Sequence, residues 1–207
     1  MIGILDYKIG NVGSVANALT KLNIPFVLTS DKTVLEKTTA LILPGVGSAN
    51  QGMENLIKLE LKNFLIDQIK SGKPFLGICL GMQLLFDNSE EGNTKCLGVL
   101  RGKVKKFRKE EKIPQIGWNK VEPMDKYFYF VNSYYCEPED KSIIAGKTKY
   151  GEEFASIIKY KNIFATQFHP EKSGKDGFQL LKDWTRHLRG DPKGLLGWWR
   201  NQEKVIC

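Results

Sequence analysis

One cysteine of this sequence stands where a nucleophile would be expected. Cys79 lies in the segment Gly77-Ile78-Cys79-Leu80-Gly81, between a predicted strand and a predicted helix. This spacing has the form of a nucleophile elbow, in which small flanking residues permit a tight strand-to-helix turn. The start of the helix would favour the thiolate, and the Leu80 N–H would face an oxyanion on the attacked carbonyl. A buried cysteine behind a glycine-rich turn fits the same pattern, so this motif alone does not establish that Cys79 is a nucleophile.

The segment His169-Pro170-Glu171 is the second candidate for chemistry, in a chain with only two histidines. Residues two apart in an extended segment point to the same side, and Pro170 disfavours helix. Glu171 would then fix the tautomer of His169 and stabilise the imidazolium. Together with Cys79, these residues would support thiolate attack, a thioester and its hydrolysis by water. We interpret the other histidine, His187, as a solvated residue near the end of a helix.

A glycine-rich segment, Leu43-Pro44-Gly45-Val46-Gly47, follows another predicted strand. Glycines allow backbone N–H groups to approach a ligand closely, although a simple turn would also explain them. Beside the Cys79 elbow, we expect Gly45, Val46 and Gly47 to form a second wall of an oxyanion hole.

The first half of the chain predicts the scaffold that positions these segments. Strands are expected at 2–5, 26–28, 40–43 and 75–78, and helices at 11–22, at 53–69 and from 80 to 86. Because strands and helices alternate, the fold class is α/β, with a mostly parallel central sheet flanked by helices.

The second half predicts antiparallel hairpins. Short β-prone runs occur at 104–107, 127–131, 154–160 and 163–168, separated by turn-like pairs such as Gly117-Trp118 and Tyr150-Gly151. A last helix is expected at 175–188. We therefore expect one domain at 1–188 and a C-terminal extension at 189–207, whose Trp198-Trp199 pair would pack on the body.

The composition excludes several classes of protein. The chain has 207 residues, of which 42% are apolar and 26% charged, and no apolar run approaches the roughly 20 residues of a membrane span. The net charge of +8 comes from scattered basic clusters, which we interpret as a solvated face, since no nucleic-acid-binding module is recognisable. The four cysteines show neither CxxC pairing nor metal-ligand spacing, so we expect free thiols, no metal and no cofactor. Without a signal-peptide pattern, a cytoplasmic location is expected.

Together these motifs resemble the class I, triad-type glutamine amidotransferases, and most of all the glutaminase subunits of imidazole glycerol phosphate synthase. The likeness runs in order from residue 1 to about 187. It is carried by Asp6-Tyr7 with Gly10-Asn11, 43–47, 77–85, Ile113-Pro114 with Gly117-Trp118-Asn119, Tyr129-Phe130-Val131 with Ser133-Tyr134, and 165–173.

The resemblance implies a role for each of these residues. Cys79 would be the nucleophile, His169 the base and Glu171 its orienting acid, with an oxyanion site from 45–47 and Leu80. The side chain of Gln83 and the backbone at Ser133-Tyr134 would hold the amino-acid end of L-glutamine. Ammonia would pass to a (β/α)₈-barrel synthase subunit of a heterodimer, which makes imidazole glycerol phosphate and AICAR in histidine biosynthesis.

Four positions depart from the family pattern. Lys8 replaces a glycine, Ala49 a phenylalanine, and Gln115 and Asn132 each replace a histidine. These departures leave open a paralogous subunit that supplies ammonia for amidation of a surface-polysaccharide sugar. A non-catalytic regulatory subunit and a cysteine peptidase on the same scaffold are further alternatives.

Overall fold

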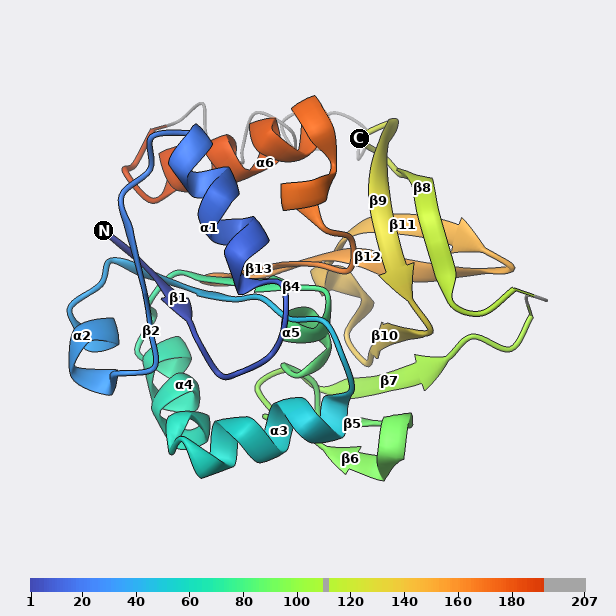
Figure 1. The fold of residues 1–207 in the computed structure, drawn as a ribbon. Helices are drawn as coiled ribbons and strands as arrows, with labels where there is room; N and C mark the ends of the chain where they lie inside the picture. The colour runs from blue at the N-terminus through green and yellow to red at the C-terminus, as the bar shows by residue number, and fades with distance from the viewer. Residues whose placement is uncertain (110–111, 192–207) are drawn as a thin grey trace.

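Five parallel strands form the centre of the fold in the computed structural model, which describes residues 1–109 and 112–191 (Figure 1). Their order is β2 (Phe26–Thr29), β1 (Ile2–Leu5), β3 (Ala40–Leu43), β4 (Phe75–Ile78) and β13 (Ile163–Thr166). All residues of β1, β3, β4 and β13 are buried. Such continuous burial is typical of parallel strands covered on both faces. The predicted α/β fold with a mostly parallel sheet is confirmed.

Further strands, most of them antiparallel to their neighbours, extend this sheet beyond β13. In order they are β12 (Glu152–Tyr160), β10 (Tyr134–Pro138), β7 (Gly102–Lys106), and the short β5 (Asn88–Ser89) and β6 (Thr94–Lys95), while β11 (Ile144–Tyr150) pairs with β12. Tyr150-Gly151 joins β11 to β12, as predicted for a turn.

A separate two-stranded sheet consists of β8 (Gln115–Val121) and β9 (Lys126–Asn132), which stand across the end of the main sheet in Figure 1. The predicted turn at Gly117-Trp118 is wrong, because both residues lie within β8 and pair in register with β9. The chain instead reverses after Val121, where Asp125 adopts a φ of 55°.

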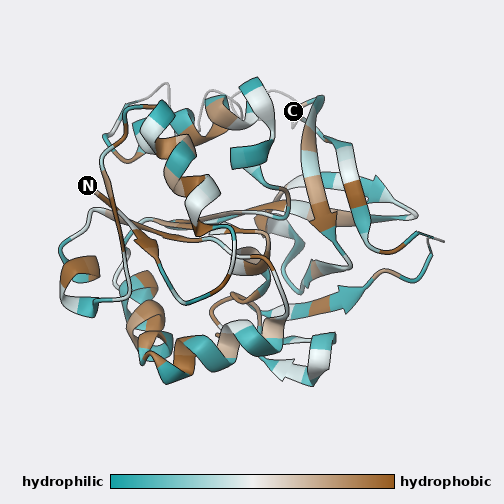
Figure 2. Ribbon diagram, viewed as in Figure 1, coloured by the Kyte–Doolittle hydropathy of each residue, from teal (hydrophilic) through white to brown (hydrophobic). Residues whose placement is uncertain are grey.

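Helices cover both faces of the sheet (Figure 1). One face carries α1 (Val12–Lys21) and α6 (Gly174–His187), and the other carries α3 (Ala49–Lys58), α4 (Leu61–Lys70) and the short α5 (Leu80–Gln83), with α2 (Lys32–Glu36) beside the β2 edge. Alternate strand residues therefore enter different cores: Leu41 and Leu43 pack in one, Ala40 and Ile42 in the other. Figure 2 shows these central strands as apolar.

The single long helix predicted at 53–69 is wrong. The chain forms α3 and α4, separated by Glu60, whose left-handed φ of 56° ends the first helix and starts the second. The break changes the direction of the axis, so that Met53 and Leu56 of α3 and Leu65 of α4 are all buried. The apolar period of the sequence continues through the break, which explains the error.

The helix predicted from 80 to 86 is also shorter than expected, because α5 ends at Gln83. Carbonyl groups that would continue the helix accept hydrogen bonds from a later loop instead: Leu84 O from Leu97 N–H, and Leu85 O from Val99 and Leu100 N–H. A distant segment thus replaces the next helical turn.

The predicted last helix is confirmed as α6, and His187, its final residue, is exposed as expected. The proposed extension at 189–207, with Trp198-Trp199, lies almost wholly outside the described residues. Within residues 1–109 and 112–191, no helix combines the length and the apolar character needed to cross a bilayer.

Candidate active site

Cys79 occupies a strained turn between β4 and α5. Its φ of 53° and ψ of −106° are unusual for a residue with a side chain. The turn requires its flanking glycines, since a Cβ on Gly81 would lie 1.8 Å from Leu43 O and one on Gly77 would lie 2.9 Å from Gly81 O. The sequence pattern around Cys79 therefore corresponds to a real elbow, in which the sulfur sits beyond the carboxyl end of β4.

Three neighbouring parallel strands bring the candidate segments together. β4 lies between β3 and β13, and all three run in the same direction. The glycine-rich segment follows β3, Cys79 follows β4, and His169 comes shortly after β13. Because the carboxyl ends of parallel strands share one edge of the sheet, residues ninety positions apart meet there.

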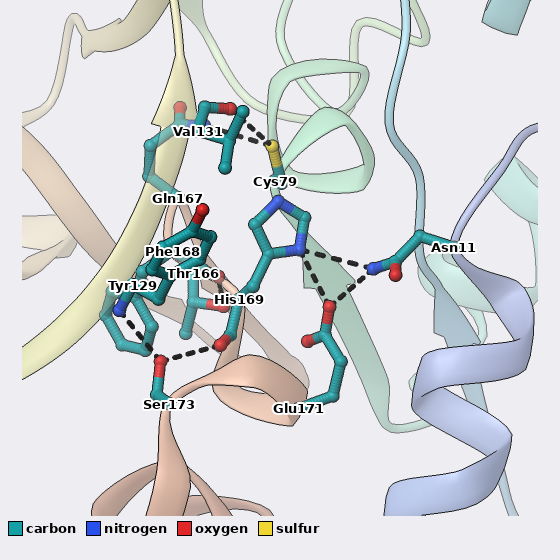
Figure 3. Close-up of polar contacts among 10 residues, drawn as sticks. All are labelled: Asn11, Cys79, Tyr129, Val131, Thr166, Gln167, Phe168, His169, Glu171 and Ser173. Carbon is teal, nitrogen blue, oxygen red and sulfur yellow. Dashed lines mark hydrogen bonds and ion pairs between the residues drawn. The ribbon is translucent and has the colours of Figure 1, made fainter. Parts of the chain in front are cut away.

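The imidazole ring of His169 lies between Cys79 and Glu171 (Figure 3). Its Nδ1 is 2.7 Å from Glu171 Oε1, and its Nε2 edge faces Cys79. The side chains of His169 and Glu171 are fully buried. Ser173 fixes the backbone, since its hydroxyl donates to His169 O at 2.6 Å and accepts from Tyr129 N–H at 2.9 Å.

The local backbone differs from the extended segment that we expected. Only His169 is extended, and Pro170–Lys172 form a single 3₁₀ turn, η3. Proline fits the first position of such a turn, because a backbone N–H at this position would have no hydrogen-bond partner within the turn. Glu171 therefore reaches His169 by folding back around the turn.

The surroundings of His169 favour its charged form. Burial by itself would lower its pKa, but the Cys79 sulfur and the Glu171 carboxylate outweigh burial and raise the pKa of His169 to about 10. His169 is therefore held as an imidazolium against the Glu171 carboxylate, with its other edge facing the Cys79 sulfur. A thiolate–imidazolium pair oriented by a carboxylate is the arrangement needed for nucleophilic attack on a carbonyl carbon.

Asn11 is a contact of this site that the sequence analysis did not assign. It precedes α1 with a left-handed φ of 79°, and its Nδ2 donates a short hydrogen bond to Glu171 Oε1. The same nitrogen is 3.3 Å from His169 Nδ1, but an Nδ1–H that donates to Glu171 cannot also accept. Asn11 therefore braces the carboxylate. The available signal was an asparagine after glycine, a residue that tolerates this backbone conformation.

A cavity of about 220 Å³ opens beside the sulfur. Of the predicted site residues, Gly45 is absent from its lining, and His169 and Glu171 are buried behind Cys79. The other residues, together with four that sequence analysis did not assign to the site, line the cavity: Val46, Gly47, Cys79, Leu80, Gln83, Ser133 and Tyr134, with Glu91, Pro114, Val131 and Asn132. Glu91 is the carboxylate of this lining, and it accepts a hydrogen bond from Ala49 N–H at 2.7 Å.

The predicted oxyanion wall is close to the elbow, but its donor is engaged. Leu80 N–H donates a long hydrogen bond of 3.4 Å to Gly45 O. Gly45 has no room for a side chain, because a Cβ would lie 2.3 Å from the Tyr7 hydroxyl. Val46 forms a bridge with Gly10, so the segment is held at two points.

The four departures from the family pattern occupy different surroundings. Lys8 is exposed, adopts a φ of 62° that glycine would accept freely, and pairs with Asp6 at 3.0 Å. Ala49 is buried at the start of α3. Gln115 and Asn132 are buried cross-strand neighbours in β8 and β9. Among the described residues, no group of three or more histidine, cysteine or acidic side chains could hold a metal ion.

Comparisons with known proteins agree with this geometry. The model of the class-I glutamine amidotransferase family matches residues 4–187. The chain is 44% identical to imidazole glycerol phosphate synthase subunit HisH of Dehalococcoides mccartyi (strain CBDB1), over 93% of this chain and 100% of the relative. It is also 44% identical to the HisH subunit of Methanocaldococcus jannaschii, over 91% of this chain and 100% of the relative.

A solved structure described as a glutamine amidotransferase shares the fold, with a TM-score of 0.74 at 20% identity over 91% of this chain and 98% of its own. The chain belongs to the class-I glutamine amidotransferase family and, within it, to the HisH subunits of imidazole glycerol phosphate synthase.

Proposed function

We propose that Cys79, His169 and Glu171 form the catalytic triad with which this chain hydrolyses L-glutamine to L-glutamate and ammonia. As a HisH subunit, the chain is the glutaminase of imidazole glycerol phosphate synthase, an enzyme of histidine biosynthesis. The observation that carries the triad is the buried His169 ring, bound to Glu171 at 2.7 Å and facing Cys79 with its other edge. These relatives favour histidine biosynthesis over the alternative of surface-sugar amidation.

The geometry accounts for each chemical step. The Cys79 thiolate attacks the side-chain carbonyl carbon of glutamine, and the carbon–nitrogen bond breaks as His169 gives its proton to the leaving ammonia. The products are a thioester and free ammonia. His169, now neutral, takes a proton from water, whose oxygen attacks the thioester and releases L-glutamate. Glu171 stabilises the imidazolium that is present before the first transfer and that forms again in the second.

The charge of the cavity suits the amino-acid end of glutamine. Glu91 is half-buried in its lining and offers a carboxylate to the α-ammonium group. Gln83 and the backbone at Ser133-Tyr134 complete the same wall, as the family resemblance implies.

Leu80 N–H is proposed to stabilise the oxyanion after a local rearrangement. In this conformation it is bound to Gly45 O, so this carbonyl has to turn away before Leu80 N–H can reach a substrate oxygen. The Leu80–Gly45 bond is long, and glycines on both sides of Val46 give the segment the freedom to turn. Such a rearrangement would allow a partner subunit to control turnover.

The outer face of the β8–β9 hairpin is the proposed docking surface for the cyclase subunit. Ile116, Trp118 and Tyr127 are 65%, 56% and 57% exposed, although they are large and apolar. Val131, on the same hairpin, lines the cavity beside Cys79. A partner bound here would cover the site from which ammonia leaves, which supports the proposed heterodimer with a (β/α)₈-barrel synthase subunit. We propose the cytoplasm as its location.

Replacement of single cysteines tests the proposal. Cys79→Ala is expected to abolish release of glutamate from glutamine in the complex with the cyclase subunit. Cys96→Ala is the matched control, because burial raises the pKa of the Cys96 thiol to about 12 and makes it inert. A diazo-ketone analogue of glutamine should label Cys79, and glutamine should protect it. Full turnover by Cys79→Ala in that complex would refute the proposed nucleophile.

A further inference from the structure

The sulfur of Cys79 has a second polar neighbour besides His169. The amide nitrogen of Gln167 lies 3.6 Å from Cys79 Sγ, within hydrogen-bond distance for sulfur. Gln167 is fully buried and directly follows β13, two residues before His169. Figure 3 shows it on the side of the sulfur near Val131. A buried amide is retained only where its hydrogen bonds are made, so this contact calls for a role.

The thiolate of Cys79 needs stabilisation that α5 supplies poorly. A helix of only four residues aligns few peptide dipoles behind the nucleophile. The carbonyl oxygen of Val131, 3.8 Å from Sγ, accepts a hydrogen bond from the thiol but repels a thiolate. An N–H donor on the same sulfur offsets both effects.

The hydrogen-bond network fixes which end of the Gln167 amide faces the sulfur. Tyr134 O is a carbonyl oxygen and only accepts, so the group of Gln83 that lies 3.1 Å from it has to be the Nε2 amide. The same Nε2 donates its other hydrogen to Gln167 Oε1, also at 3.1 Å. With its oxygen held by Gln83, Gln167 presents its N–H group to Cys79.

We propose that Gln167 is a catalytic residue whose amide N–H stabilises the Cys79 thiolate, and that Gln83 holds this amide in its donating orientation. The proposal rests on the proposed function, since it takes Cys79 as the nucleophile. It also links substrate to nucleophile, because Gln83 lines the cavity proposed for glutamine. Bound L-glutamine that contacts Gln83 therefore acts, through Gln167, on the same Cys79 sulfur that attacks its side-chain carbonyl group.

The pH dependence of Cys79 alkylation tests the contact without substrate or partner. Iodoacetamide modification of the Cys79 peptide is followed by mass spectrometry across the pH range, which separates it from the other cysteines. Gln167→Met keeps the size of the side chain but has no donor. Its alkylation midpoint should move upward by about one to two pH units, the effect of losing a hydrogen bond to a charged group. In the complex, kcat should fall about ten- to hundredfold with little change in KM.

Two further variants make the test decisive. Gln83→Met leaves the Gln167 amide free to rotate, so the alkylation midpoint of Cys79 should also rise in this variant. If Gln167→Met does not fold, Gln83→Met serves as the test. Asn162→Leu is the control: its amide donates to Ile69 O and Lys73 O at the opposite edge of the sheet, and its loss should leave the midpoint unchanged.

A wild-type alkylation midpoint in folded Gln167→Met or folded Gln83→Met would overturn the proposal. The proposed function fails by a different observation, turnover in Cys79→Ala, so the two failures are distinguishable.

Discussion

Gln115 on β8 lies directly opposite Asn132 on β9. These are two of the four positions at which the sequence analysis noted a departure from the family pattern, each in place of an expected histidine. They are 3% and 5% exposed, and neither amide oxygen has a hydrogen-bond partner among the described residues. Because directly opposed side chains in an antiparallel pair are in contact, the two departures form a single structural change at the edge of the glutamine cavity.

This pairing predicts non-additive effects on stability. Gln115→His and Asn132→His, made singly, each place a ring against an unmatched amide, and each should lower the melting temperature by several degrees, since overpacking a buried site costs about 1–3 kcal/mol. The melting temperature of the double variant should be higher than the value obtained by adding the losses of the two single variants. Thermal unfolding of the four proteins measures this coupling. Simple additivity would show that the pair is not a unit.

Asn11 should affect turnover through Glu171. Asn11→Gly accepts the left-handed backbone but removes the donor to Glu171, so kcat should fall about ten- to hundredfold. Asn11→Asp should lower kcat further, because it places a second negative charge beside the Glu171 carboxylate. Asn23→Gly is the matched control: Asn23 has a φ of 54° and an exposed side chain. Steady-state glutaminase assays of the complex compare them, and equal rates for Asn11→Gly and Asn23→Gly would contradict this role.

The pKa of His169 should depend on Cys79. Because the sulfur is the main group that raises it, the pKa should fall well below about 10 in Cys79→Ala, where burial regains influence. An NMR titration of the imidazole protons measures this directly. An unchanged His169 titration would show that the two side chains do not interact.

The raised pKa also predicts a dependence of stability on pH. Between the ordinary histidine value of 6.5 and about 10, folded His169 keeps a proton that the unfolded chain has lost. The stability contributed by this proton is fully present below pH 6.5 and disappears as pH rises through about 10. Measured by urea unfolding from pH 6 to 10, the free energy of unfolding should therefore fall more steeply for the wild type than for His169→Gln. Parallel curves would contradict the prediction.

A charge introduced among the exposed apolar residues of the β8–β9 docking surface should weaken binding of the cyclase subunit. Ile116→Asp is expected to weaken binding of the cyclase subunit about a hundredfold, the size of effect seen when an apolar anchor of an interface is lost. Ile57→Asp on α3 is the matched control, since Ile57 is 56% exposed and Ile116 is 65% exposed. Calorimetric titration with the partner compares the two. Equal affinities would place the interface elsewhere.

The sequence by itself determined the nucleophile elbow, the parallel half of the sheet and the family. Gly77 and Gly81 are visible in the sequence because only glycine fits beside Leu43 O and within the turn. The strands of the parallel half are visible because burial on both faces requires continuous apolar runs. These features depend on residues close together in the chain.

The tertiary structure decided what depends on distant segments. The N–H groups of 97–100 bind the carbonyl groups that follow α5, so the helix ends there. Glu60 divides an unbroken apolar period into two helices, and pairing with β9 makes Gly117-Trp118 part of a strand instead of the expected turn. The contacts of Asn11 with Glu171 and of Gln167 with Cys79 join residues 160 and 88 positions apart. A hydrogen bond between buried side chains leaves no local pattern in a sequence, because its partner is chosen by the packing of the sheet.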